Sequence, residues 1–193
     1  MIRGQYKIVV IGVSFGGLTA LSTLLKPLPA AFPVPLLIVQ HTSPDADAFL
    51  PAHLNKLSRL QVKEAEPGEL ARPGTVYLAP PNYHLLLEDD LSLSLSADER
   101  INYSRPSIDV LFESAAHSCG KEVIGIILTG ANNDGSRGLR TIQVCGGLTI
   151  VQDPDSAEAA MMPRAALDAC RVDHLLPLPE IAPFLIGLIC GKT

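Results

Sequence analysis

Residues 7–17 read KIVVIGVSFGG, an apolar run that leads directly into a glycine-rich turn. The run lacks the alternation of a half-exposed strand and therefore predicts a strand that is buried on both faces. Similar runs, LLIVQ and VIGIIL, alternate along the chain with helical patterns. Because this alternation is typical of a parallel sheet covered by helices, we predict a three-layer α/β/α sandwich with a mainly parallel, doubly wound sheet.

The predicted elements follow this pattern over the whole chain. We expect strands at 7–11, 35–40, 122–128, 148–152 and 173–176, and helices at 16–25, 46–57, 106–118, 135–144, 163–169 and 179–189. Residues 74–96 differ, because two alternating runs meet at 88–90 and predict a small antiparallel hairpin insertion or a three-strand meander. No linker composition interrupts the chain, so we expect a single domain over residues 1–193.

The composition excludes several classes of protein. The chain has 193 residues, of which 47% are hydrophobic and 18% charged, so it is not a disordered chain. The formal net charge of −5 disfavours binding to nucleic acid, which depends on Lys and Arg. No apolar run approaches the roughly 20 residues of a membrane span, and the N-terminus lacks a signal-peptide pattern. We expect a cytoplasmic protein with no nucleic acid partner and no membrane insertion.

Cysteines and acidic residues give no indication of a metal or cofactor. The four cysteines, at 119, 145, 170 and 190, show no CxxC spacing, and no set of ligands has zinc spacing. The acidic cluster at 88–90 is interpreted as a solvated turn. We therefore expect no metal and no cofactor.

The turn after the first strand contains Gly12-Val13-Ser14-Phe15-Gly16, a Gly-x-Ser-x-Gly pattern between a strand and a helix. Such a turn presents a serine oxygen, and the amides at the helix N-terminus can stabilise an oxyanion. The same glycines could cradle a dinucleotide phosphate or simply form a tight turn. The second strand does not end in the acidic residue that a dinucleotide site needs, which disfavours the nucleotide interpretation.

Two further polar residues follow predicted strands. His41 comes directly after the strand at 35–40, and Asp134 lies in the TGANNDG segment after the strand at 122–128. Parallel strands place their carboxyl ends at one edge of the sheet, so His41 could act as base for Ser14 and Asp134 could orient the imidazole. His41 could instead be an ordinary loop residue, and Asp134 a helix N-cap.

The chain resembles the catalytic domain of the chemotaxis protein-glutamate methylesterase family, CheB. The matching blocks run nearly end to end and are IGVSFGG, VQH, PGELARPGTVYLAPPNYHLLL, RPSIDVLFESAA, ILTGANNDGSRGL, GGLTIVQDPDSAEAAMMPRAAL and VDHLLPL. The resemblance implies that Ser14, His41 and Asp134 form the catalytic triad. It also implies that the backbone amides of Phe15 and Ala131 form the oxyanion hole.

The resemblance further implies a substrate and partners. Members hydrolyse γ-glutamyl methyl esters on the cytoplasmic domains of chemoreceptors, and they also deamidate receptor glutamines. The receiver domain that precedes the catalytic domain in the family is absent from this sequence, so we expect a separate response regulator as a further partner. Two residues are candidates for substrate binding: Arg105, which precedes a predicted helix and could steer an acidic receptor surface, and Met162, which matches a family position near the site. A solvated loop arginine and a packed methionine are the alternatives, and His84 is interpreted as structural.

This sequence departs from the family pattern at the site. Phe15 replaces the usual Thr, and Ala131-Asn132 replaces the usual Met-Gly, where we expect Asn132 to tolerate a positive φ. Backbone amides survive these changes, but contact with the substrate changes. Two other functions stay open on this ground: a serine esterase or amidase with a different substrate, and a non-catalytic binding module.

Overall fold

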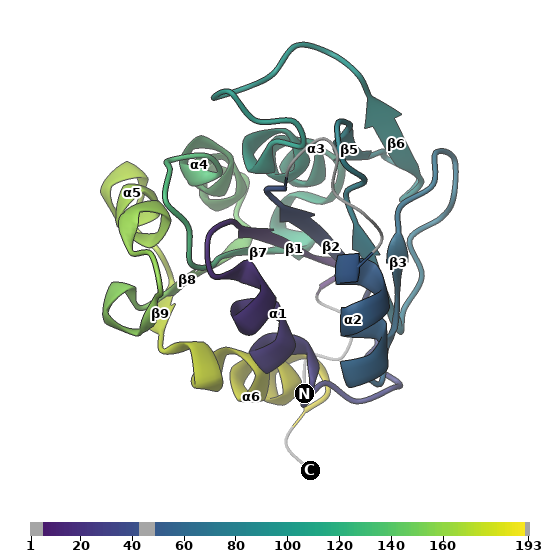
Figure 1. The fold of residues 1–193 in the computed structure, drawn as a ribbon, viewed down its shortest axis with the longest axis horizontal. Helices are drawn as coiled ribbons and strands as arrows, with labels where there is room; N and C mark the ends of the chain where they lie inside the picture. The colour runs from purple at the N-terminus through teal and green to yellow at the C-terminus, as the bar shows by residue number, and fades with distance from the viewer. Residues whose placement is uncertain (1–5, 43–48, 192–193) are drawn as a thin grey trace.

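The computed structural model describes residues 6–42 and 49–191 and contains a seven-stranded parallel sheet. The strand order is β3-β4-β2-β1-β7-β8-β9, and a separate two-stranded antiparallel sheet pairs β5 with β6 (Figure 1). The strands are β1 (Ile8–Val13), β2 (Leu36–Gln40), β3 (Gln61–Glu64), β4 (Thr75–Leu78), β5 (His84–Leu87), β6 (Leu93–Ser96), β7 (Val123–Ile127), β8 (Leu148–Gln152) and β9 (His174–Leu176).

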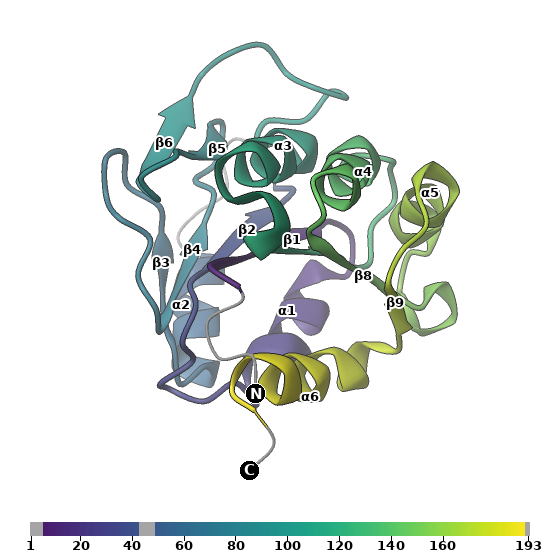
Figure 2. The same cartoon turned by 180° about the vertical axis from the view of Figure 1, so that it is seen from behind.

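Helices cover both faces of the large sheet. They are α1 (Gly17–Leu25), α2 (Phe49–Leu57), α3 (Ile108–Cys119), α4 (Ser136–Val144), α5 (Met161–Ala169) and α6 (Leu178–Ile189), with short 3₁₀ turns at Gly120–Glu122 and Pro154–Ser156. Figures 1 and 2 show α3, α4 and α5 on one face and α1, α2 and α6 on the other. The predicted three-layer sandwich is therefore confirmed. Within the described residues, no helix has the length and apolar character that a membrane span requires.

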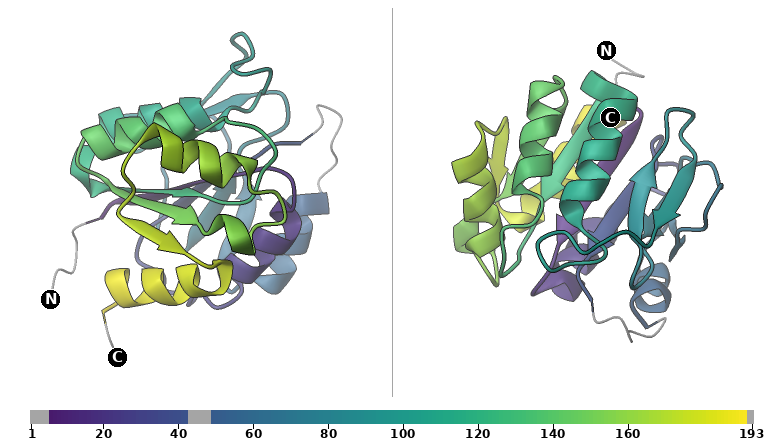
Figure 3. Two further views of the ribbon diagram at one scale, coloured as in Figure 1. Left: turned by 90° about the vertical axis from the view of Figure 1, so that its left-hand side faces the viewer. Right: turned by 90° about the horizontal axis from the view of Figure 1, so that it is seen from above.

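The central strands of the sheet are buried on both faces. Every residue of β1 and β7 is buried, and their side chains contribute to apolar clusters on both sides of the sheet. This double burial accounts for the absence of apolar–polar alternation in their sequences. The end view in Figure 3 shows the two helix layers with the sheet between them.

The order in which the chain adds strands to the sheet reverses at β1, although all the strands run parallel. The chain passes from β1 to β2 on one side and later returns to β7 on the other side. Ligands bind parallel α/β sheets at such a switch point, beyond the carboxyl ends of the strands. The segments that follow β1, β2 and β7 therefore meet at the edge where a site is expected.

The predictions for residues 61–96 need correction. The antiparallel hairpin is confirmed in β5 and β6, whereas the three-strand meander is wrong, because β4 joins the parallel sheet beside β2. All four residues of β4 are buried, as its internal place in the sheet requires. The sequence analysis missed β3, and residues 46–48 of the helix predicted at 46–57 lie outside the described residues.

Candidate active site

The nucleophile candidate Ser14 lies directly after β1, where the chain turns into α1. Its backbone N–H donates to the Thr129 carbonyl at 3.0 Å, which joins the turn to the segment after β7. Gly16 has a φ of 79°, a conformation that favours glycine and lets α1 begin one residue later. The Ser14 side chain is half-buried, and its hydroxyl makes no hydrogen bond with another described residue.

Two backbone amides, one on the turn after β1 and one on the segment after β7, have no hydrogen-bond partner among the described residues. They belong to Phe15 and Ala131, and both residues are exposed. Thr129 connects the two segments, because its hydroxyl donates to the Phe15 carbonyl at 2.9 Å and accepts from the Ala159 N–H at 2.8 Å. Unpartnered N–H groups on connected turns are what an oxyanion hole requires.

His41 follows β2 and is held beside the nucleophile turn by its backbone. Its N–H donates to the Val13 carbonyl at 3.1 Å. The side-chain amide of Gln40 donates to the carbonyls of Ser14 and His41, at 2.9 and 2.8 Å. The backbones of the candidate base and nucleophile are therefore fixed to one another through a single glutamine.

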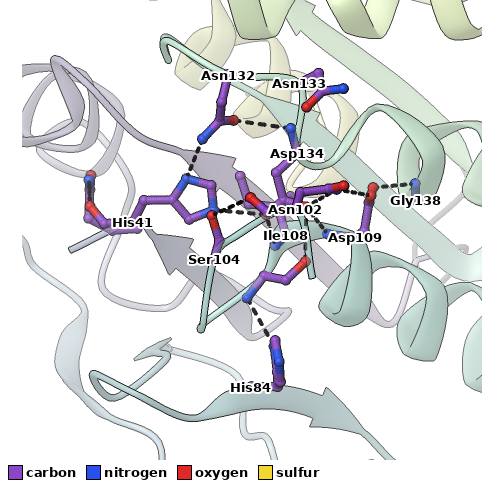
Figure 4. A network of polar contacts seen from close by, with 12 residues as sticks. His41, His84, Asn102, Ser104, Ile108, Asp109, Asn132, Asn133, Asp134 and Gly138 are labelled. Atoms are coloured by element: carbon purple, nitrogen blue, oxygen red, sulfur yellow. Dashed lines mark hydrogen bonds and ion pairs between the residues drawn. The ribbon is translucent and has the colours of Figure 1, made fainter. Parts of the chain in front are cut away.

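Asp134 is fully buried and receives hydrogen bonds from several donors (Figure 4). Its carboxylate accepts from His41 Nε2 at 2.8 Å, from the Ile108 N–H at 2.7 Å and from the Ser107 hydroxyl at 2.9 Å. The Asp109 N–H donates at 3.2 Å. Because these backbone donors belong to the first turn of α3, the carboxylate lies at the positive end of that helix.

Burial and hydrogen bonding act on the pKa of Asp134 in opposite directions. Burial disfavours the charged form and raises the pKa, but the hydrogen bonds from His41 and the Ile108 N–H lower it below the ordinary value. The carboxylate therefore stays ionised opposite the imidazole. The N-cap interpretation is wrong, because Gly135 is the N-cap of α4 and no side chain caps that helix.

The imidazole of His41 is held at both nitrogens. In a neutral imidazole the nitrogen that faces the Asp134 carboxylate is the one that carries the proton, which makes Nε2 the donor and Nδ1 the acceptor. Asn132 places its side-chain amide nitrogen 3.0 Å from Nδ1. The expected reason for Asn132 was wrong, because it is not among the residues with positive φ. The Ser14 hydroxyl and the His41 ring are not hydrogen-bonded to each other in this structure.

The remaining predicted residues lie around this group. The Arg105 guanidinium donates to Ala97 and Asp98 carbonyls and to the Asn82 side chain, so its hydrogen bonds fix a loop that borders His41. Met162 is buried beneath Gly130, next to Ala131. Their contact with substrate stays a prediction.

His84 has the structural role expected of it. Only 1% of its surface is exposed, and its ring accepts the Ser107 N–H at 3.1 Å. Its other nitrogen lies 3.1 Å from the Glu99 carbonyl. His84 therefore holds the segment that leads into α3, whose first turn binds Asp134.

The chain and its fold are similar to those of known proteins. The family model CheB methylesterase matches residues 9–185. The chain belongs to the CheB methylesterase family. It is 51% identical over 184 residues to a putative protein-glutamate methylesterase/protein-glutamine glutaminase from Leptospira interrogans, with 95% of each chain covered. The Thermotoga maritima CheB methylesterase catalytic domain has a TM-score of 0.91 and 36% identity, covering 95% of this chain and 99% of that one.

A relative from Moorella thermoacetica shows how the chain relates to longer members. It is named protein-glutamate methylesterase/protein-glutamine glutaminase and is 41% identical over 193 residues. The match covers 98% of this chain and 46% of the relative. This chain therefore corresponds to about half the length of that relative.

Sequence analysis missed the residues that assemble the site through hydrogen bonds. Gln40, Thr129 and Ser107 each join two segments that are distant in sequence. Nothing in their spacing indicated this. One local signal was available for Asn132: an Asn two residues before Asp134 can accept the latter's N–H, and this bond is present at 3.0 Å.

Proposed function

We propose that this chain is a serine hydrolase that demethylates γ-glutamyl methyl esters on the cytoplasmic domains of chemoreceptors. The main observation behind this proposal is that Ser14, His41 and Asp134 follow three adjacent parallel strands at their carboxyl ends, with His41 and Asp134 hydrogen-bonded to each other. Family membership supports the assignment, because the described relatives are named protein-glutamate methylesterases. The resemblance supplies the receptor as partner and the cytoplasm as location.

The proposed reaction begins when Ser14 attacks the ester carbonyl and its hydroxyl proton passes to Nδ1 of His41. The Asp134 carboxylate stabilises the imidazolium that forms. The N–H groups of Phe15 and Ala131 donate to the oxyanion of the tetrahedral intermediate. Methanol leaves with the proton from His41, and an acyl-enzyme remains on Ser14.

Hydrolysis of the acyl-enzyme repeats these roles with water as nucleophile. His41 removes a proton from water, the hydroxide attacks the acyl carbon, and Ser14 is released with the returned proton. The product is a glutamate side chain. The same steps with ammonia as leaving group convert glutamine to glutamate, which is the protein-glutamine glutaminase activity for which the relatives are also named.

The alternative of a different ester substrate rests on Phe15. Its side chain is 59% exposed beside the nucleophile. An exposed aromatic ring there adds apolar surface to the substrate side of the turn. A small apolar ester would then be a better substrate than a receptor glutamate ester.

The deciding experiment measures methanol release from a receptor whose glutamates carry tritiated methyl esters. We expect release by the wild-type chain and none above background by Ser14→Ala. Small methyl and p-nitrophenyl esters are assayed in parallel with the same enzyme preparation. Turnover of small esters without methanol release from the receptor would instead support the alternative substrate, and no turnover of either would overturn the hydrolase assignment.

A further inference from the structure

The resting hydrogen bonds of His41 leave no acceptor for the nucleophile. Nε2 is bonded to Asp134, so Nδ1 is the single ring nitrogen that can accept a proton from Ser14. The Asn132 amide nitrogen lies 3.0 Å from Nδ1. An imidazole nitrogen has one lone pair in the ring plane, and Asn132 occupies it.

The orientation of the Asn132 amide is fixed from its other end. Its side-chain oxygen accepts the Asp134 N–H at 3.0 Å, so the NH₂ group must face His41 (Figure 4). Asn132 is half-buried and, because its φ is not positive, the backbone does not require an asparagine there. Both polar atoms of the side chain are therefore used, and both uses concern the acid–base pair.

We propose that Asn132 is a positioning residue that holds the catalytic imidazole in a resting state. Its amide selects the tautomer with the proton on Nε2, and it competes with the Ser14 hydroxyl for Nδ1. Ser14 becomes activated only after the Asn132 amide leaves Nδ1. This inference rests on the proposed function, because it assigns Ser14 and His41 as nucleophile and base.

The charge state of the ring decides how strongly Asn132 can act. An imidazolium carries a proton on Nδ1 and would face the NH₂ group of Asn132, so two donors would oppose each other. Among the described residues, the other ionisable groups around the ring are the Asp134 carboxylate and, across a pocket of about 90 Å³, Arg100, Tyr103 and Arg105. Among these, the carboxylate alone favours the imidazolium.

Two substitutions separate this role from a role in the loop. Asn132→Ser keeps a short oxygen that can accept the Asp134 N–H, but it removes the donor to Nδ1. Asn132→Asp keeps the acceptor at full length and places a carboxylate oxygen at Nδ1, which favours a proton there. A residue needed only for the loop would tolerate Asp better than Ser, whereas the proposal predicts the opposite order.

The experiment measures the rate at which a fluorophosphonate labels Ser14 in the whole chain. In that step the serine oxygen bonds to phosphorus, fluoride leaves, and the hydroxyl proton passes to His41. We expect Asn132→Ser to label roughly three- to tenfold faster than wild type, the factor that corresponds to one neutral hydrogen bond. We expect Asn132→Asp to label at least roughly tenfold more slowly at pH 7, and this loss should shrink as the pH is raised.

A second readout does not depend on activity. Nitrogen-15 NMR of the His41 ring reports which nitrogen carries the proton. We expect an unprotonated Nδ1 in wild type and a protonated Nδ1 in Asn132→Asp at pH 7. If wild type is not labelled at Ser14, the proposed function fails, and the NMR spectra alone decide the role of Asn132. Unchanged ring protonation in Asn132→Asp, or faster labelling of that variant than of Asn132→Ser, would overturn the inference.

Discussion

The two halves of the candidate active site differ in how completely their polar groups are bonded. The acid–base half is saturated: Asp134 accepts from His41 and from the first turn of α3, and both nitrogens of His41 have partners. The nucleophile half is open, because the Ser14 hydroxyl and the Phe15 and Ala131 amides bond to no other described residue. Substrate can therefore bind to the nucleophile half while the hydrogen bonds of the acid–base half stay intact, and only the later activation of Ser14 requires the bond between Asn132 and Nδ1 of His41 to open.

This difference between the two halves predicts which substitutions affect the stability of the fold and which affect turnover. A fully bonded buried carboxylate is costly to alter, since several donors would lose their partner. Groups without partners can be altered with little effect on the fold. Substitutions in the nucleophile half should therefore affect turnover alone, whereas substitutions at Asp134 should affect both turnover and folding.

The largest expected effect is that of Ser14→Ala on ester turnover. We expect a loss of roughly 10³-fold or more, because removal of a triad nucleophile eliminates the covalent route. The melting temperature should stay close to that of wild type, because the hydroxyl has no partner to lose. Turnover of a methylated receptor and thermal unfolding measure the two effects. A large drop in melting temperature would contradict the view that the nucleophile half contributes little to stability.

Next in size is the combined loss of His41 and Asp134. Each single variant, His41→Ala and Asp134→Asn, should reduce turnover by roughly 10²- to 10⁴-fold, because the base is lost or left without its orienting charge. The double variant should be little worse than the poorer single variant. Steady-state kinetics on a small ester would check this, and multiplied losses would show that the two residues act independently.

Asp134→Asn should also destabilise the fold, by about 3 kcal/mol at neutral pH. The new NH₂ group would stand either in place of Oδ2, facing both the Ile108 N–H and His41 Nε2, or in place of Oδ1, facing the Asp109 N–H, so at least one buried donor would lose its acceptor. Chemical denaturation measures the change, with Ser14→Ala as the matched control.

The same substitution predicts a difference in acid sensitivity. The pKa of Asp134 is lower in the folded chain than its unfolded value of about 4. The stability that the carboxylate contributes is therefore fully present above about pH 4, and it is lost as the pH falls through the folded-state pKa. Stability of Asp134→Asn relative to wild type should improve over that range. A constant difference down to pH 2 would contradict the assigned direction.

The smallest effect is expected at Asp109, a second buried carboxylate in the same region. Burial raises its pKa, although the Gly138 N–H at 2.8 Å opposes the shift. A raised pKa means that ionisation of Asp109 costs stability as the pH rises from the unfolded value to the folded one. Asp109→Asn removes this charge and keeps an oxygen for Gly138, so we expect a change within about 1 kcal/mol. A loss as large as that of Asp134→Asn would show that the two carboxylates are equivalent.

Sequence patterns predicted the parts of the molecule that depend on local periodicity. The runs that form β1, β2 and β7 are continuous and apolar, and the residues after them follow from the geometry of parallel sheets. β3 was missed because Gln61–Glu64 is short and contains a single buried residue. Partner choice could not be read from such patterns: β4 has the alternation of a hairpin strand but pairs in parallel with β2.

The candidate site likewise has residues that sequence patterns predict and contacts that they do not. Ser14, His41 and Asp134 could be found because each follows a strand that the sequence predicts. The bond from Asn132 to His41 could not be found, because it depends on the side-chain orientation set by the Asp134 N–H. Likewise, the placement of the α3 N-terminus against Asp134 requires close packing, since a side chain at Gly12 would come within 2.3 Å of Ile108.

The most direct test of the central claim locates the covalent adduct that a fluorophosphonate forms with the wild-type chain. The labelled protein is digested, and the modified residue is identified by tandem mass spectrometry. We predict one adduct, on Ser14, whose formation is reduced at least roughly a hundredfold in folded His41→Ala. An adduct on another residue, or labelling of Ser14 at an unchanged rate without His41, would contradict the assignment of a serine nucleophile served by the His41–Asp134 pair.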